Sequence, residues 1–129
     1  MIEDKLTEKI IGAAYRVHNN LGFGFREKIY QRAMVVALRK MGLEVEEEYP
    51  LAIFFDGEKI GRHRADLYVG QKVLVELKAI LSLSKGDEVQ LVNYLKATGI
   101  ETGLLINFGQ SVQIRRKYKN YRPRKPDTS

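Results

Sequence analysis

The chain has 129 residues, of which 44% are hydrophobic, so it is long enough for one domain with a single core. It contains no cysteine, which excludes disulfide frameworks and thiolate metal sites. No stretch approaches the roughly 20 apolar residues of a membrane-spanning helix, and the N-terminus does not resemble a secretion signal. These features predict a soluble, cytoplasmic protein with no membrane partner.

The formal net charge of +6 comes entirely from the C-terminal end of the chain. Residues 1–114 are neutral overall, whereas residues 115–129 carry seven basic groups and one acidic group, with two tyrosines among them. Basic residues interleaved with aromatics suit a phosphate backbone and exposed bases, although a solubilising tail has the same composition. We expect one domain over residues 1–117 and a flexible basic tail over residues 118–129. The cations expected to contact nucleic acid here are Arg115, Arg116, Lys117 and Lys119.

The first part of the chain has the apolar spacing of two amphipathic helices. In residues 3–21 apolar side chains recur every three or four positions, and a Gly-Phe-Gly run at residues 22–24 ends the pattern. The second helix is expected over about residues 25–41, with Gly42 as its stop. Its inward side is predicted to consist of Ile29, Ala33, Val36, Ala37 and Leu38.

A β-meander is expected next, with strands over about residues 43–55, 59–69 and 72–80. Pro50 predicts a bulge or an edge position in the first of these strands. The Asp56-Gly57 pair is a turn signal between the first and second strands. Three antiparallel strands should therefore follow the two helices.

The last part of the chain returns to a helix and then to strands. Ser84, with an aspartate three residues later, resembles a capping box and predicts a helix to about residue 98, where a glycine stops it. Residues 102–108 are nearly all apolar and should form a strand buried on both faces, and residues 110–117 indicate an edge strand. The order α-α-β-β-β-α-β-β predicts an α/β fold with a mixed β-sheet, in which the helical crossover makes its two flanking strands parallel.

The two middle strands of the meander carry a candidate site. Pairing apolar residues 67–69 with apolar residues 73–75 places Asp66 opposite Glu76, with Lys78 farther along on the same face. Carboxylates are the ligands that Mg²⁺ prefers, and a lysine beside the metal can orient or deprotonate a water. The same residues would also suit the solvated face of an ordinary hairpin, so the pattern alone leaves both interpretations open.

Two pairs of polar and aromatic residues lie on the predicted helices. Glu27 and Tyr30 are three residues apart, and Gln90 and Tyr94 are four residues apart, so each pair shares a helix face. Singly, each has an ordinary explanation: a carboxylate near a helix N-terminus is favoured by the helix dipole, and the other three residues suit a helix surface. The two pairs indicate a function only when they are considered together with the candidate site residues on the predicted strands.

The two histidines are further candidates for chemistry. His63 lies on the same predicted strand as Asp66 and could contact phosphate together with Arg62 and Arg64. An ordinary exposed strand position is the interpretation that we favour for it. His18 ends the first helix, where a helix-end or core-margin role is expected, so neither histidine is assigned to the site.

Taken together, the motifs resemble those of the GxxExxY proteins, a branch of the PD-(D/E)XK nuclease superfamily. In the family's order the chain carries Gly24-x-x-Glu27-x-x-Tyr30, Ala65-Asp66, Glu76-x-Lys78 and Gln90-x-x-x-Tyr94. The resemblance covers nearly the whole chain and implies a restriction-endonuclease-like mixed β-sheet flanked by helices. One departure is an alanine at position 65, where the superfamily's name has proline.

The resemblance also implies a role for each residue at the site. The ligands for Mg²⁺ or Mn²⁺ would be Asp66, Glu76 and the backbone carbonyl of Leu77. Lys78 would assist the nucleophile, and Glu27 would act as a second-sphere or water-mediated ligand. The implied activity is metal-dependent hydrolysis of phosphodiester bonds.

The implied partner is nucleic acid, with DNA favoured over RNA. Gln90 and Tyr94 are similar to the QxxxY motif of RecB-type nucleases, which lies beside the site and the DNA; Tyr30, Arg62 and Arg64 are further expected contacts. Two alternatives remain: a non-catalytic nucleic-acid-binding module that keeps the nuclease fold, and a structure-selective junction endonuclease. A homodimer that pairs two sites is compatible with so short a chain.

Overall fold

The structure is a computed structural model that describes residues 2–120. The element order matches the expected one. The elements are α1 (Ile2–Leu21), α2 (Glu27–Lys40), β1 (Val45–Phe55), β2 (Glu58–Val69), β3 (Val73–Lys78), α3 (Lys85–Thr98), β4 (Thr102–Phe108) and β5 (Val112–Tyr118). Most of the expected tail, from residue 121 onward, lies outside the described residues. No helix in the described part of the chain is long and apolar enough to cross a membrane.

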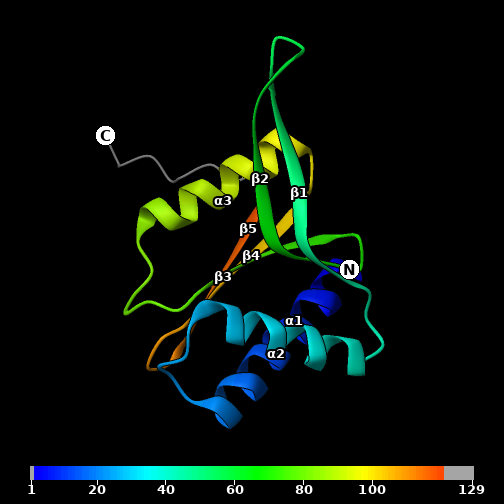
Figure 1. The fold of residues 1–129 in the computed structure, drawn as a ribbon. Helices are drawn as coiled ribbons and strands as arrows, with labels where there is room; N and C mark the ends of the chain where they lie inside the picture. Colours follow the sequence, from blue (N-terminus) through cyan, green and yellow to red (C-terminus); the bar gives the residue numbers. More distant parts are fainter. Residues whose placement is uncertain (1, 121–129) are drawn as a thin grey trace, which may run out of the picture.

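The five strands lie side by side in chain order, and all neighbours are antiparallel except β3 and β4. The crossover through α3 makes that pair parallel, as expected. Helices α1 and α2 cover one face of the sheet and α3 covers the other (Figure 1). Strand β4 has a neighbour on each side and helices on both faces, which explains why all seven of its residues are buried. The predicted α/β class and mixed sheet are confirmed.

Local signals in the sequence account for the element boundaries. The Ser84 hydroxyl accepts a hydrogen bond from the Asp87 amide (3.2 Å), and the Asp87 carboxylate accepts one from the Ser84 amide (2.9 Å), which completes the capping box. Gly99 ends α3 in the left-handed conformation (φ 77°). Asp56 and Gly57 both have positive φ, as a type I′ hairpin turn requires. Pro50 lies in β1, which is an edge strand.

The buried face of α2 differs from the expected one. Ile29 and Val36, predicted to point inward, are exposed, and Val36 retains 51% of its accessible surface. Tyr30 and Met34 are fully buried instead, together with the correctly predicted Leu38. Compared with the expectation, the helix is rotated about its own axis by about one residue. Its tyrosine ring and its methionine therefore fill the core against the sheet in place of the two β-branched side chains.

Tyr30 connects the start of α2 to the end of β4. Its ring stacks on Phe108 with centroids 4.5 Å apart and planes 4° apart. Its hydroxyl donates to the Gly22 carbonyl (2.6 Å) and accepts from the Phe25 amide (3.3 Å). Because the side chain is fully buried, the expected contact between Tyr30 and nucleic acid is not retained. Tyr30 instead fixes the connection between α1 and α2.

Substitution Tyr30→Phe should lower the free energy of unfolding by about 1–2 kcal/mol, because it removes both hydrogen bonds and leaves a partly buried carbonyl of Gly22 without its donor. Urea denaturation monitored by circular dichroism measures the change. Tyr15→Phe on the exposed side of α1 is the matched control, and it should change the unfolding free energy by less than about 0.5 kcal/mol. Equal effects of the two substitutions would contradict the role given to the Tyr30 hydroxyl.

Candidate active site

The site lies where β2 and β3 separate. The two strands form only three residue pairs, Leu67–Val75, Tyr68–Leu74 and Val69–Val73, in the register expected from the sequence. Beyond these pairs β2 leaves β3 and continues as a long hairpin with β1 (Figure 1). Regular pairing therefore ends one step before Asp66 and Glu76. The direct opposition expected for these two residues is replaced by a widening gap between the strands.

Asp66 reaches across this gap to the backbone of β3. Its Oδ2 atom accepts a hydrogen bond from the Leu77 amide at 2.7 Å. Burial raises the pKa of the Asp66 carboxyl to about 6, against the lowering effect of the Leu77 amide. The negative charges of Glu27 and Glu48 raise this pKa further, while Lys78 lowers it. The carboxylate is thus held in place but is costly to ionise.

Glu76 is the second buried carboxylate of the site. Burial, followed by the charge of Asp66, raises the pKa of Glu76 to about 8. Lys78 and a backbone hydrogen bond from Asp66 act in the opposite direction. Two neighbouring carboxyls that both resist ionisation form an environment in which a cation would be favoured.

His63 contacts this site, contrary to the exposed strand position that the sequence favoured. Its Nε2 atom lies 3.1 Å from Glu76 Oε1. Its ring stacks on Tyr94 of α3, with centroids 3.9 Å apart and planes 6° apart. Burial, and then the charge of Lys78, lowers the pKa of His63. Gln90 is exposed one helical turn before Tyr94, so the α3 motif borders the site through its tyrosine.

A backbone irregularity explains how His63 reaches Glu76. The pairing of β1 with β2 skips Glu48 and Asp66, and Glu48 has φ 53°. Leu67 packs on the α1–α2 side of the sheet, whereas Ala65, two residues earlier, packs on the α3 side. A residue with positive φ in a strand interrupts simple alternation. The sequence contains no glycine at this point that would have signalled the change.

Glu48 is a further acidic neighbour that the motifs did not include. It accepts hydrogen bonds from Lys28 Nζ (2.6 Å) and Gln31 Nε2 (3.1 Å) of α2. These two contacts, with Lys28 the stronger, lower the pKa of Glu48. The pKa of Glu27, at the first position of α2, is raised, chiefly by burial, and the charge of Lys78 offsets part of this rise. The start of α2 therefore faces the same patch of charge as the two strands.

Asn107 fixes the segment that follows Lys78. It pairs with Lys78 across the β3–β4 ladder and is fully buried. Its side-chain amide exchanges two hydrogen bonds with the backbone of Ile80, each of 2.9 Å, and donates a third to Gln113 Oε1 at 3.0 Å. Gln113 also accepts from the Leu83 amide (3.1 Å). The chain leaving β3 is thereby held against β4 and β5.

The basic residues expected to contact nucleic acid near the C-terminus are largely engaged within the fold. Lys117 is only 8% exposed, and its Nζ atom lies 2.7 Å from Glu88 Oε1. Arg115 approaches the same glutamate at 3.7 Å, and Lys119 pairs with Glu101 at 2.9 Å. Strand β5 includes Tyr118, so the folded part extends past the expected boundary at residue 117. Arg115 and Lys117 thus lie in the last strand, as expected, but both are in contact with Glu88, and Lys119 of the expected tail is in contact with Glu101.

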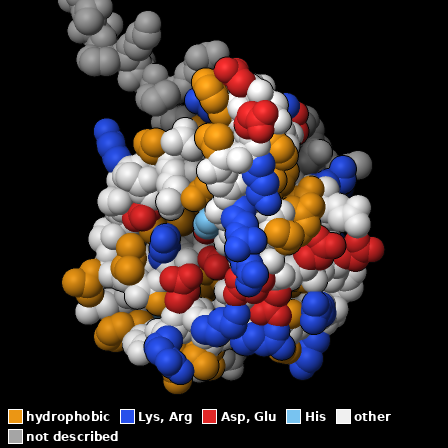
Figure 2. All heavy atoms as spheres, turned by 45° about the horizontal axis from the view of Figure 1, so that its top comes forward, with side chains coloured by type: hydrophobic (Ala, Val, Ile, Leu, Met, Phe, Trp, Pro, Cys, Tyr) orange, Lys and Arg blue, Asp and Glu red, His pale blue; other side chains and the backbone are white. Residues whose placement is uncertain are grey.

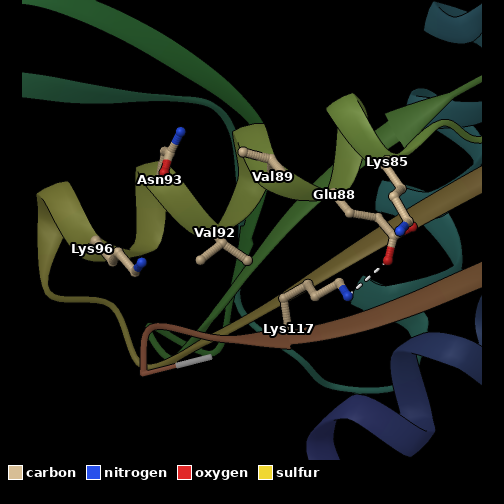
Figure 3. A pocket seen from close by; sticks show the side chains of 7 residues that line it. All are labelled: Lys85, Glu88, Val89, Val92, Asn93, Lys96 and Lys117. Atoms are coloured by element: carbon tan, nitrogen blue, oxygen red, sulfur yellow. Dashed lines mark ion pairs between the residues drawn. The ribbon is translucent and has the colours of Figure 1, made fainter. Parts of the chain in front are cut away.

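A cavity of about 180 Å³ lies between α3 and β5, away from the paired carboxylates (Figure 3). Its lining residues are Lys85, Glu88, Val89, Val92, Asn93, Lys96 and Lys117. The face that carries the site is different in character: a column of Lys and Arg side chains runs beside a histidine and a group of acidic side chains (Figure 2). Asp66 and Glu76 thus do not line this cavity.

Comparisons with known proteins identify the family and the fold of the chain. A family model described as the PD-(D/E)XK nuclease superfamily matches residues 4–119. The crystal structure of a protein designated SSO0001 resembles the chain with a TM-score of 0.54 at 19% identity, over 70% of this chain and 48% of that one. The chain spans about half of the length of that solved protein, and the likeness concerns the fold alone. Comparison with curated proteins gave no match.

The raised pKa of Glu76 predicts a pH-dependent stability. The folded state retains a proton that the unfolded state releases, so this stabilisation is present below pH 4.5 and is lost as the pH rises through about 8. Glu76→Gln replaces the buried anion with a neutral group of the same shape. We expect the variant to exceed the wild type in unfolding free energy by on the order of 2 kcal/mol at about pH 9, and to match it near pH 5.

Urea unfolding at the two pH values, without divalent metal, measures this difference. Glu46→Gln changes an exposed glutamate of β1 and serves as the control, with little effect expected at either pH. A stabilisation by Glu76→Gln that is the same at both pH values would show that ionisation of Glu76 is not its cause.

Proposed function

The chain belongs to the PD-(D/E)XK nuclease superfamily, and from this membership we propose that it is a metal-dependent nuclease that hydrolyses phosphodiester bonds, with DNA as the preferred substrate. The observation that carries the proposal is the pair of partly buried carboxyls, Asp66 and Glu76, whose pKa values are raised and which adjoin Lys78 at the point where β2 and β3 separate. An ordinary solvated hairpin face would leave such carboxylates exposed and unperturbed.

The donor set at this point fits a hard divalent cation. Asp66 and Glu76 would hold Mg²⁺ or Mn²⁺ together with the backbone carbonyl of Leu77 and water, because oxygen ligands suit these ions. Within residues 2–120 no group of three or more acidic or histidine side chains could hold a metal, which is compatible with an ion that keeps several waters. When bound, the ion would polarise a phosphoryl oxygen and lower the pKa of a coordinated water.

Lys78 and Glu27 supply the remaining charges of the proposed mechanism. Lys78 would orient the attacking water and stabilise the negative charge that develops on the phosphoryl group. Glu27 approaches from the start of α2, and its pKa responds to Lys78. It would hold a water of the site instead of contacting the ion directly. Together these residues provide the positioning and electrostatic parts of phosphodiester hydrolysis.

His63 has the geometry of a positioning residue for Glu76. The imidazole is fixed between the Tyr94 ring and the Glu76 carboxylate, so it would restrict the rotation of that carboxylate. Tyr94 would thus act through His63, while the exposed Gln90, together with Arg62 and Arg64 of β2, would face nucleic acid.

Assignment to the GxxExxY branch is part of the proposal. Tyr30 supports it because the tyrosine holds the connection that precedes α2 and so sets the position of Glu27, three residues earlier. Gly24 has φ 110°, a conformation that favours glycine. The first and last residues of the Gly24-x-x-Glu27-x-x-Tyr30 motif thereby act on backbone geometry, and the middle one supplies a carboxylate to the site.

Substitution Lys78→Ala should reduce metal-dependent cleavage by on the order of a hundredfold or more without loss of fold, since it removes a charge that is needed in the transition state. Asp66→Asn and Glu76→Gln should have comparable effects, because each removes a ligand. Cleavage of labelled DNA in Mg²⁺ or Mn²⁺ measures the rate. Lys72→Ala, in the exposed turn between β2 and β3, is the matched control and should retain full activity.

Two outcomes would revise the proposal. If the purified protein binds nucleic acid but cleaves no form of DNA or RNA in either metal, the chain is a binding module that keeps the nuclease fold. If Lys78→Ala cleaves as fast as the wild type, the role given to the lysine is wrong.

The C-terminal cations should contribute to the salt dependence of binding. Because β5 extends to Tyr118, a truncation that spares the sheet has to begin after Asn120, and it removes Arg122, Arg124 and Lys125. Loss of three phosphate contacts should reduce the slope of log affinity against log salt by about 2.5 for a duplex. Salt titrations of DNA binding by full-length and truncated protein measure this difference.

A variant with three cations of α1 replaced by glutamine, at Lys5, Lys9 and Arg16, is the control for the loss of charge. It should leave the slope nearly unchanged. An equal loss of slope in the truncated protein and this variant would indicate that net charge, and not contact by the C-terminal end, controls the affinity.

A further inference from the structure

The β1–β2 hairpin extends well beyond the rest of the fold (Figure 1), and the residues near its turn include exposed apolar side chains. Phe54, Phe55 and Ile60 retain 60%, 65% and 65% of their accessible surface. A bulge lies at the same place, because Ile53 pairs with Gly61 and Phe54 pairs with Lys59, which leaves Ile60 unpaired. We call these three exposed apolar residues the apolar tip; Phe54 and Phe55 are successive strand residues and so point to opposite faces, and Phe54 also lines a pocket beside the end of α3.

The stem of the hairpin has the opposite character and leads into the site. Arg62 and Arg64 are exposed on β2, and Asp66 follows two residues after Arg64, where the alternation is interrupted. Arg64 lies close enough to Glu48 to lower its pKa, which places its charge at the border of the site. The basic column beside the acidic group is visible on this face (Figure 2). Cations therefore occupy the part of the hairpin between the apolar tip and the carboxylates.

The acidic residues of the turn lie at the far end of the hairpin, next to the apolar tip and Lys59. Asp56 and Glu58 lie at the turn, where their charges would repel phosphate. The faces of the bases are the apolar surface of a nucleic acid, and in a duplex they are stacked inside. They become accessible where bases are unpaired, or where an apolar side chain is inserted between steps.

We propose that the β1–β2 hairpin is a DNA-binding arm: Arg62 and Arg64 hold the backbone that leads into the site, and the apolar tip stacks on unpaired bases. The preferred substrate is then DNA with a junction between double and single strand. This inference rests on the proposed nuclease function, because it takes nucleic acid as the partner. It adds the structural class of the substrate and the residues that recognise it.

The length of the arm sets the spacing between recognition and cleavage. Six residues separate Ile60 from Asp66, which corresponds to roughly 20 Å of strand. Along a duplex with about 3.4 Å per step, the unpaired bases should lie no more than about six base pairs from the cleaved bond. A recognised junction and the cut would therefore stay at a fixed, short separation.

The test measures binding in the absence of divalent metal, so that it does not depend on cleavage. The probes are a forked DNA with 2-aminopurine at the first unpaired position and a blunt duplex of the same length. The wild type should bind the fork about tenfold more tightly than the duplex, as stacking on one or two bases would give, and it should change the 2-aminopurine fluorescence. The variant Phe54→Ser/Phe55→Ser/Ile60→Ser should lose this preference and bind the duplex as before.

The matched control is Val36→Ser/Met41→Ser, which removes two exposed apolar side chains from α2 and from the residue that follows its last turn; it should keep the fork preference. Substitution of Arg62 and Arg64 by alanine should weaken binding to fork and duplex alike, because phosphate contacts carry no preference between them. Circular dichroism verifies that each variant is folded.

Three results would contradict the proposal that the hairpin is a DNA-binding arm. The wild type could bind fork and duplex equally, the triple variant could keep the preference, or sedimentation could show a dimer that the triple variant dissociates while fork binding is unchanged. The last result would make the tip a self-association surface. If the protein prefers the fork, loses this preference in the triple variant and cleaves no nucleic acid, the hairpin is a DNA-binding arm and the proposed nuclease function is wrong.

Discussion

The hydrogen bond from the Leu77 amide to Asp66 Oδ2 is the contact on which the candidate site depends. It forms where the β2–β3 ladder ends, and it replaces a backbone pair with a side-chain contact. Were the ladder to continue, Asp66 and Glu76 would be two unremarkable neighbours on a sheet. Because regular pairing ends here, the Asp66 carboxylate accepts from the Leu77 amide, while the Glu76 carboxylate accepts from the Asp66 backbone and lies beside His63.

This arrangement carries an electrostatic cost, whereas polar groups elsewhere in the fold are mostly paired. Two buried carboxyls resist ionisation, and neither has a strong ion pair of the kind that holds Glu48 or Glu88. The apolar contacts around the site offset that cost, since two clusters of buried side chains lie on opposite faces of the sheet. A site that is unfavourable when empty of cations is what a binding site for a divalent ion requires.

The sequence predicted the fold more completely than the surroundings of the site. Alternation of apolar residues determined the β2–β3 register, and the Ser84 capping box and Gly99 determined the bounds of α3. The positions of His63 and Glu48 at the site were not predicted, because Glu48 adopts a positive φ and no glycine in the sequence indicates it.

Two other errors had different causes. The rotation of α2 was misjudged since exposed β-branched residues were taken for core residues. The pairing of Lys117 with Glu88 joins residues far apart in the chain, which local patterns do not report.

The anchoring of the segment after Lys78 by Asn107 has a consequence for the order in which the molecule is assembled. Strand β4 supplies Asn107, so the segment after Lys78 can take its final position only when β4 has joined the sheet. Without β4, strand β3 has its three pairs with β2 and its packing against α1 and α2. The part of the chain that is synthesised first therefore contains both carboxylates of the pair, whereas the contact that fixes the segment beyond them comes from a strand made later.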